Sequence, residues 1–179
     1  ALIASKEEWV NLLQLVQEDL PHEQLVEALG STGVLQASIA IKEKVVAQDP
    51  HETGLRKILN FGHTVGHAIE SAALEHNALP HGYCVLWGMV AEVYLSVVKL
   101  GCPREVLQQL TQIMLQYYGR PQCNCKQREQ LIQRMYRDKK NSANRTPNFT
   151  LLRAVGEPEI NQYVSEKDID EALEYLFSL

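Results

Sequence analysis

Residues 56–70 read R-K-I-L-N-F-G-H-T-V-G-H-A-I-E, and residues 81–89 read H-G-Y-C-V-L-W-G-M. His63 and His67 are four residues apart, about one helical turn, so an α-helix would project both imidazoles from the same face. His81 follows a Leu-Pro step and begins a second, strongly apolar helical run. A helix, a short loop and the start of a second helix are therefore expected to bring three imidazoles near one another.

Three such imidazoles are candidate ligands for a divalent metal ion. Two of them with one oxygen ligand would leave a coordination position open, as a catalytic zinc requires. The spacing alone does not say which two would bind, and an ordinary helix pair with stray histidines is the alternative. A glycine in a helix costs about 0.8–1 kcal/mol relative to alanine, so the flanking glycines indicate a close approach to the backbone. These glycines are Gly62, Gly66, Gly82 and Gly88.

Length and composition indicate one globular domain. The chain has 179 residues, of which 45% are hydrophobic and 22% charged, ordinary values for such a domain. A net charge of −5 disfavours a nucleic-acid partner, which usually requires a basic surface. Glu92 interrupts the apolar run after His81, so neither a membrane span nor a membrane partner is expected.

The cysteines show no disulfide framework. Cys123 and Cys125 are too close for an ordinary disulfide, and Cys84 and Cys102 lie in or beside helical runs. This pattern suits a reducing compartment, so we expect a cytoplasmic location. Because no Met opens the chain, we also expect it to begin inside a longer protein.

Hydrophobic periodicity predicts a mainly α-helical fold for residues 1–179, organised as a single domain. One short β segment is expected at Asn148–Val155, where an extended connection is the alternative. The run between Gly82 and Leu100 is apolar nearly all round and is expected at the buried centre of the bundle. Helices are expected near residues 5–20, 22–29, 31–49, 59–75, 82–100, 103–118 and 128–137, and from 165 onward.

The two quoted stretches closely resemble the signature of the 3-dehydroquinate synthase family, R-x-x-L-N-x-G-H-T-x-G-H-A-I-E followed by H-G-x-x-V-x-x-G-M. The resemblance extends upstream through I-K-E-K-V-V-A-Q-D-P-H-E-T-G-L-R and downstream to D-K-K-N, so it covers most of the chain. It implies a two-domain enzyme with an N-terminal NAD-binding α/β domain and a C-terminal helical domain. Only the helical domain is expected in this chain.

The resemblance also implies an activity. Members of the family convert 3-deoxy-D-arabino-heptulosonate 7-phosphate to 3-dehydroquinate and phosphate, a carbon–oxygen lyase step in the shikimate pathway to chorismate and the aromatic amino acids. NAD is used and regenerated within the turnover, and a divalent metal is bound, usually Zn2+ and alternatively one such as Co2+. No nucleotide-binding glycine fingerprint occurs in the 179 residues, so no cofactor-binding residue for NAD is expected here. We expect the chain alone to be inactive and the full-length enzyme to be a homodimer.

Carried over to this sequence, the resemblance assigns His63 and His81 as metal ligands. The third family ligand is a glutamate that would precede residue 1. His67 matches a histidine near the substrate phosphate, where an imidazole can donate a hydrogen bond or relay a proton. Lys139 and Lys140 lie in the D-K-K-N loop, where the family supplies a lysine to the phosphate, and either one could fill that role.

A second group of matched residues concerns the substrate carboxylate. Lys42, Arg56 and Asn60 match the family residues at this group, and Arg can bind a carboxylate through two parallel hydrogen bonds. If residues 56–63 were helical, Arg56 and Asn60 would lie close to the face that carries His63. Glu52 matches an active-site acid. The catalytic residues implied by the resemblance are therefore His67, Lys42 and Glu52.

Three other functions were weighed. A sister sugar-phosphate cyclase such as 2-deoxy-scyllo-inosose synthase shares the histidines, but its substrate has no carboxylate, so the carboxylate-binding set favours dehydroquinate synthase. A zinc hydrolase of the H-E-x-x-H type is disfavoured because no Glu follows His63. A non-catalytic helical interaction domain would bind no metal at these histidines. Tyr83, Cys84 and Trp87 depart from the usual family pattern beside His81.

Overall fold

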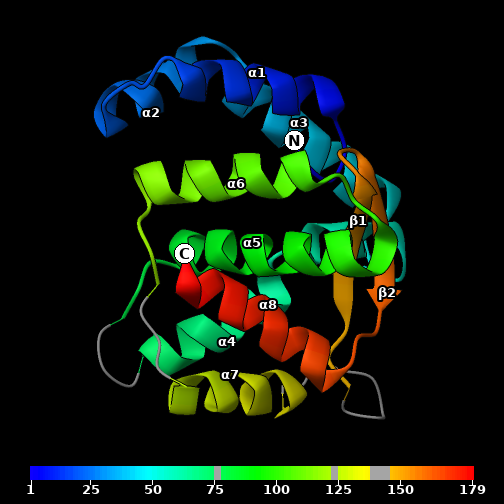
Figure 1. Ribbon diagram of the computed structural model, residues 1–179. Helices are drawn as coiled ribbons and strands as arrows, with labels where there is room; N and C mark the ends of the chain where they lie inside the picture. Colours follow the sequence, from blue (N-terminus) through cyan, green and yellow to red (C-terminus); the bar gives the residue numbers. More distant parts are fainter. Residues whose placement is uncertain (75–77, 122–124, 138–145) are drawn as a thin grey trace.

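The structure, a computed structural model, describes residues 1–74, 78–121, 125–137 and 146–179. Within these ranges the chain forms α-helices, one 3₁₀ helix (η1) and an antiparallel β-hairpin (Figure 1). The mainly α-helical fold is therefore confirmed. In chain order the elements are α1 Lys6–Gln17, α2 His22–Ser31, α3 Val34–Gln48, η1 Leu55–Asn60, α4 His63–Ala73, α5 His81–Leu100, α6 Arg104–Tyr117, α7 Cys125–Arg137, β1 Phe149–Ala154, β2 Glu157–Gln162 and α8 Glu166–Ser178.

Helix α5 runs through the centre of the molecule (Figure 1). Helix α6 covers one side of it, α4 and α8 pack on the other, and the hairpin closes its C-terminal end. Val90, Ala91, Val93 and Leu95 of α5 have no exposed surface. Burial of a valine or leucine side chain contributes about 1.5–3 kcal/mol. The expected central position of this apolar helix is confirmed.

Helix α5 is also long and apolar enough, by length and composition, to cross a membrane. Its position explains this composition without a membrane, because the helix is the core of the bundle and packs on four other elements. Glu92 and Ser96, both in α5, are completely buried polar residues. They bind other parts of the protein, as described below.

Several helix ends are closed by a capping side chain or a glycine. The Ser5 hydroxyl accepts a hydrogen bond from the Glu8 N–H at 3.1 Å, and Ser165 forms a capping box with Asp168 at the start of α8. Gly101, with φ of 72°, ends α5. Helix α2, expected near residues 22–29, continues two residues further, through Ser31.

The sequence-based helix at 59–75 is wrong in its first turn. Residues Leu55–Asn60 form η1, Phe61 is extended, and Gly62 adopts a left-handed φ of 82° before α4 begins at His63. Only glycine adopts that backbone conformation without strain. Arg56 and Asn60 are thus on a separate element and do not extend the helical face of His63.

The expected strand at Asn148–Val155 is confirmed as β1, but its partner β2 was missed. The two strands are joined by Val155 and Gly156, and Gly156 has φ of 84°. Strand β2 contains Pro158 and several polar residues, a composition that does not indicate a strand. It is half-exposed at the edge of the pair, where the missing proline N–H is tolerated.

Two of the four cysteine side chains are described. Cys84 and Cys102 are free and buried. Cys123 lies outside the described residues, and of Cys125 only the backbone, at the start of α7, is described.

The glycines beside the histidines explain how closely α4 and α5 approach. A Cβ atom on Gly88 would lie 2.1 Å from the carbonyl oxygen of Gly62, and one on Gly66 would lie 3.0 Å from that of Cys84. A Cβ atom on Gly62 would lie 2.4 Å from Met89. The expected close approach is therefore confirmed at three glycines and is wrong at Gly82, around which nothing lies within 4 Å.

The connection from α3 to η1 is organised by Asp49. Its Oδ1 accepts from the N–H and hydroxyl of Thr53, and its Oδ2 accepts from the N–H groups of Gly54 and Arg56 at 2.8 and 2.9 Å. The N–H groups of Arg56 and Gly54 hold the pKa of Asp49 well below its usual range. This network includes Glu52, which has a positive φ of 56°.

A pair of glycine-to-alanine substitutions tests the helix crossing. We expect Gly88→Ala to destabilise the protein by about 1–3 kcal/mol or more, because the new methyl group meets backbone that cannot move alone. Gly82→Ala, in the first turn of the same helix, should be neutral or stabilising by less than about 1 kcal/mol. Urea unfolding followed by circular dichroism measures both, and equal effects would contradict the close crossing.

Substitution of Asp49 tests the loop network through its pH dependence. An acid whose folded-state pKa is depressed stabilises the protein above its unfolded pKa of about 3.9 and loses this contribution as the pH falls toward the folded pKa. Asp49→Asn removes that contribution and places an NH2 group against N–H donors. We expect the stability difference from the unaltered protein to be largest near neutral pH and to shrink below about pH 4. A difference in urea unfolding that does not change with pH would contradict this role.

Candidate functional site

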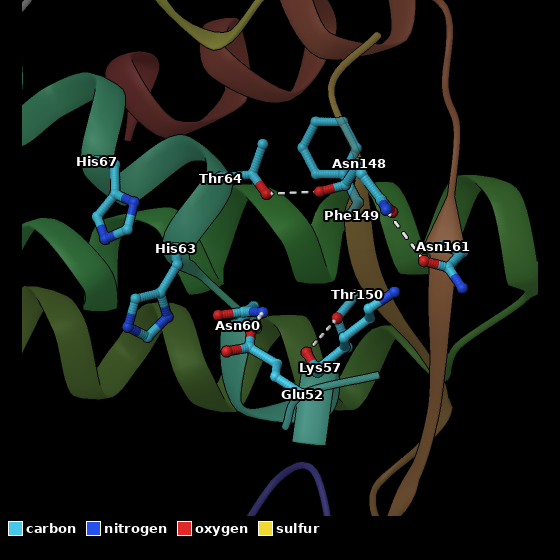
Figure 2. A pocket seen from close by; sticks show the side chains of 10 residues that line it. All are labelled: Glu52, Lys57, Asn60, His63, Thr64, His67, Asn148, Phe149, Thr150 and Asn161. Atoms are coloured by element: carbon cyan, nitrogen blue, oxygen red, sulfur yellow. Dashed lines mark hydrogen bonds between the residues drawn. The ribbon is translucent and has the colours of Figure 1, made fainter. Parts of the chain in front are cut away.

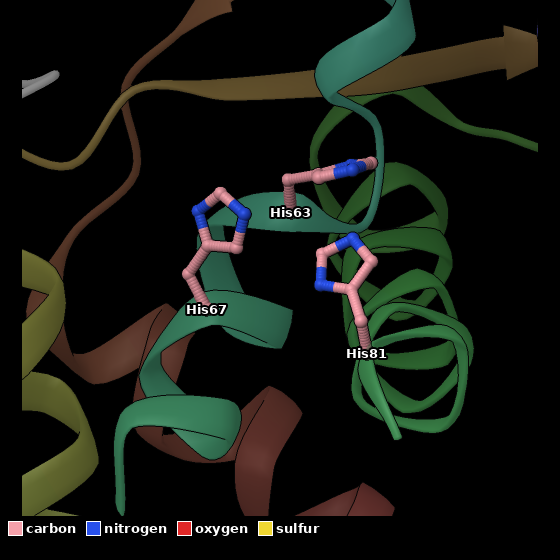
Figure 3. Close-up of side chains that lie close together, drawn as sticks. All are labelled: His63, His67 and His81. Atoms are coloured by element: carbon pink, nitrogen blue, oxygen red, sulfur yellow. The ribbon is translucent and has the colours of Figure 1, made fainter. Parts of the chain in front are cut away.

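The three imidazoles converge as expected (Figure 3). His63 begins α4, His67 lies one turn later, and His81 begins α5. The ring centroids of His63 and His67 are 5.2 Å apart. The ring centroid of His81 lies 5.5 Å from that of His63 and 5.8 Å from that of His67. One ligand atom from each residue lies within 4.8 Å of the others.

This arrangement fits a divalent metal ion. Ligands bound to tetrahedral zinc at 2.0–2.1 Å lie about 3.4 Å apart. Small rotations of the imidazoles can bring their nitrogen atoms, now within 4.8 Å of one another, to this separation. His63 Nδ1 lies 3.1 Å from the carbonyl oxygen of Phe61, and His81 Nδ1 lies 3.0 Å from Oε2 of Glu70. When Nδ1 donates to an oxygen, Nε2 keeps its lone pair for a metal, as in many metal sites.

Glu70 was not assigned a role from the sequence, although it ends the quoted H-A-I-E stretch. Its carboxylate, on α4, orients the imidazole of His81 at the start of α5. Residue spacing within α4 could not indicate this contact, because the partner lies on another helix. His81 is 52% exposed and Glu70 30% exposed. The candidate metal site therefore lies at the surface, where a further ligand could reach it.

A polar pocket adjoins the histidines (Figure 2). It includes His63 and His67, so the three-histidine cluster and the pocket share two side chains. Its walls come from the α3–η1 connection, η1, α4, and the hairpin with the residue before it. The lining residues are Glu52, Lys57, Asn60, His63, Thr64, His67, Asn148, Phe149, Thr150 and Asn161.

Four of the residues assigned from the sequence line this pocket, namely Glu52, Asn60, His63 and His67. Asn60 Nδ2 donates a hydrogen bond to Oε1 of Glu52 at 2.6 Å. The amide and the carboxylate thus hold each other in place. Although the helical break separates Asn60 from α4, the tertiary fold returns it to the same cavity as His63.

Arg56 and Lys42, which were also assigned from the sequence, are not among the lining residues of the pocket. Arg56 Nη1 donates to the carbonyl oxygen of Pro50 at 2.9 Å. Lys42 is exposed on α3, which packs beside η1. Lys139 and Lys140 lie outside the described residues.

Sequence reasoning missed the contribution of the hairpin. Asn148 Nδ2 donates to Oδ1 of Asn161 at 3.0 Å, and Asn161 has a left-handed φ of 57° beside an irregularity in the strand pairing. Thr64 Oγ1 donates to the Asn148 carbonyl at 2.8 Å, which ties the hairpin to α4. No local signal could have placed these residues, because about 85 residues separate Thr64 from its partner.

Lys57 also lines the pocket, although the sequence assigned a role only to the neighbouring Arg56. It is the one Lys or Arg among the described residues that line the pocket. Its carbonyl oxygen accepts from Thr150 Oγ1 at 3.0 Å, which fixes its backbone against β1. Lys57 is therefore a candidate to contact an anionic group in the pocket.

Glu92 binds the backbone at the start of α4, beside His63. It is completely buried, and its carboxylate accepts hydrogen bonds from the N–H groups of Gly62, Thr64 and Val65. Burial raises the pKa of Glu92 to about 8, and the hydrogen bonds from these backbone groups oppose the rise. In the sequence this residue was seen only as an interruption of an apolar run.

Comparison with known proteins identifies relatives over most of the chain. The family model for the 3-dehydroquinate synthase C-terminal region matches residues 1–141. The chain is 38% identical to a 3-dehydroquinate synthase of Parabacteroides distasonis over 175 residues, which cover 97% of this chain and 48% of that protein. The corresponding protein of Dehalococcoides mccartyi is 37% identical over 142 residues, covering 79% of this chain and 38% of the relative. The chain spans about half the length of the curated relatives it matches, or less.

Solved structures share the fold. ValA, a 2-epi-5-epi-valiolone synthase from Streptomyces hygroscopicus subsp. jinggangensis with NAD+ and Zn2+ bound, matches with a TM-score of 0.76 at 20% identity, covering 99% of this chain and 48% of that one. A 2-deoxy-scyllo-inosose synthase complexed with carbaglucose-6-phosphate, NAD+ and Co2+ matches with a TM-score of 0.71 at 19% identity, covering 97% and 48%. These two likenesses concern the fold, whereas the family model and the sequence relatives identify the family. The chain therefore belongs to the 3-dehydroquinate synthase C-terminal family.

Proposed function

We propose that this chain is the helical, metal- and substrate-binding part of a 3-dehydroquinate synthase. The reaction is the conversion of 3-deoxy-D-arabino-heptulosonate 7-phosphate to 3-dehydroquinate and phosphate, a step of aromatic amino-acid biosynthesis. The observation that carries the proposal is the group of three imidazoles, with ligand atoms within 4.8 Å of one another, beside a polar pocket. The names of the sequence relatives support it.

In this proposal His63 and His81 bind the metal through Nε2. The opposite nitrogen of each imidazole already lies near an oxygen acceptor, Phe61 O or Glu70 Oε2. A glutamate from a segment preceding residue 1 completes the site. When held by these residues, Zn2+ or Co2+ would supply Lewis-acid chemistry at a substrate hydroxyl.

The remaining residues of the chain bind and orient the substrate. His67 donates a hydrogen bond to the leaving phosphate or relays a proton to it, and Lys139 or Lys140 supplies a further cation. Asn60 and Lys42 bind the substrate carboxylate together with Arg56, whose guanidinium has five donors and uses one on Pro50. Glu52, held by Asn60, orients a substrate hydroxyl.

NAD, when bound, would supply reversible hydride transfer with no net oxidation over the turnover. We propose that an N-terminal α/β domain outside this chain holds it. The full-length enzyme is proposed to be a homodimer in the cytoplasm that acts on a small sugar phosphate. The net charge of −5 means that a phosphate and a carboxylate must be attracted by local cations.

A second candidate is another sugar-phosphate cyclase activity. It is favoured by the fold likeness to ValA and to 2-deoxy-scyllo-inosose synthase, and by the position of Arg56 and Lys42 outside the pocket lining. Assays of the full-length enzyme with heptulosonate phosphate and with a sugar phosphate that has no carboxylate separate the two. Turnover of the second substrate alone would replace the proposed function with the alternative.

Zinc titration by calorimetry tests the proposed metal site. The three proteins compared are the 179-residue chain, its His63→Ala/His81→Ala variant, and a protein extended upstream through the expected glutamate. We expect one tight site in the extended protein, weak binding by the chain and none by the variant, because two imidazoles alone form an incomplete site. Equal binding by all three proteins, or by none, would contradict the assignment.

Lys57 provides a separate test of the pocket. In the full-length enzyme Lys57→Met should raise KM for the sugar phosphate by about 10–100-fold, the effect of losing one charge-assisted hydrogen bond of about 1.5–3 kcal/mol. Lys44→Met, at an exposed position of α3, is the matched control and should leave KM unchanged. An equal KM in both variants would exclude Lys57 from substrate binding.

A further inference from the structure

The backbone on both sides of His63 is bound by one buried side chain from another helix. Glu92 Oε2 accepts a hydrogen bond from the Gly62 N–H at 2.7 Å. Its Oε1 accepts from the N–H groups of Thr64 and Val65 at 3.2 and 3.4 Å. The carboxylate thus binds the residue before His63 and the two residues after it.

These hydrogen bonds replace a local helix cap. The first N–H groups of an α-helix have no partner within the helix, and the N-cap residue of α4 is Gly62, which has no side chain to supply one. Glu92 supplies the acceptors instead, from a position 27–30 residues later in the chain.

Glu92 and His81 belong to the same helix. His81 is the first residue of α5, and Glu92 lies eleven residues, or about three turns, further along. The contact between Glu92 and the start of α4 therefore connects the backbone around His63 to the helix that carries His81. The glycine contacts set how closely the two helices approach, and the carboxylate contact sets where the start of α4 lies along α5.

We propose that Glu92 is a positioning residue for the metal centre, which fixes the direction of His63 relative to His81 through the backbone of Gly62, Thr64 and Val65. The inference rests on the proposed metal site. It predicts that a Glu92 variant that still folds binds the metal more weakly than the unaltered protein. Second-sphere groups that orient metal ligands typically change metal affinity by about 10–100-fold.

Ser96 provides a matched control for a purely structural role. It lies one turn after Glu92 on α5 and is also completely buried. Its hydroxyl donates to the Glu92 carbonyl at 2.6 Å and accepts from the Leu152 N–H at 2.9 Å. Ser96 thus ties α5 to the hairpin and makes no such contact with α4, so Ser96→Ala removes two buried hydrogen bonds without freeing His63.

The experiment compares the full-length protein with its Glu92→Gln, Glu92→Asp and Ser96→Ala variants. Cobalt(II) titration at one fixed pH, followed by the visible absorption bands, reports metal affinity and coordination geometry, and urea unfolding reports stability. Glutamine keeps the shape of the side chain but turns an NH2 group toward N–H donors. Aspartate keeps the carboxylate but is one methylene too short to reach α4.

We expect Glu92→Gln to weaken cobalt binding by about tenfold or more and to change the absorption bands. Glu92→Asp should do the same to a smaller degree, and it serves as the test if the Gln variant does not fold. Ser96→Ala should lose stability but keep its cobalt affinity within about twofold, since the start of α4 is undisturbed.

Two results would overturn the proposal in different ways. Cobalt binding by a folded Glu92 variant with unchanged affinity and spectrum would show that Glu92 only stabilises the fold, and the metal site itself would stand. Absence of cobalt binding by the unaltered full-length protein would overturn the proposed metal site and the positioning role with it.

Discussion

The contact between the backbones of α4 and α5 is the constraint on which the rest of the site depends. Gly62, Gly66 and Gly88 remove the side chains that would hold the two helices apart. Glu92 then binds the start of α4 from within α5. Because each helix begins with a histidine, the same contact that builds the core also brings the imidazoles together.

The substrate pocket is assembled from segments far apart in the chain. Asp49 folds the α3–η1 connection, and this places Glu52 and Asn60 opposite the histidines. The hairpin forms the remaining wall and is held to α4 and η1 by the hydroxyls of Thr64 and Thr150. Short polar contacts thus position a site whose scaffold is apolar.

The candidate metal site is open on the side of His81, which is half-exposed. A catalytic zinc keeps one coordination position for water or substrate besides its protein ligands, and the exposed side leaves space for such a ligand. The pocket holds neutral amides, one lysine and one carboxylate among its described lining. A phosphate and a carboxylate on one substrate would need further cations, which Arg56, Lys42 and the D-K-K-N lysines are proposed to supply.

The family, the mainly helical fold, the central position of α5 and the meeting of His63, His67 and His81 could all be predicted from the sequence. These follow from local periodicity and from a long contiguous motif, both of which are complete within short segments. The break at Gly62, the second strand, the contact of Glu70 with His81 and the burial of Glu92 could not be predicted in this way. Each of these depends on a partner distant in sequence or on a backbone conformation stabilised by that partner, and periodicity within a segment contains no information about either.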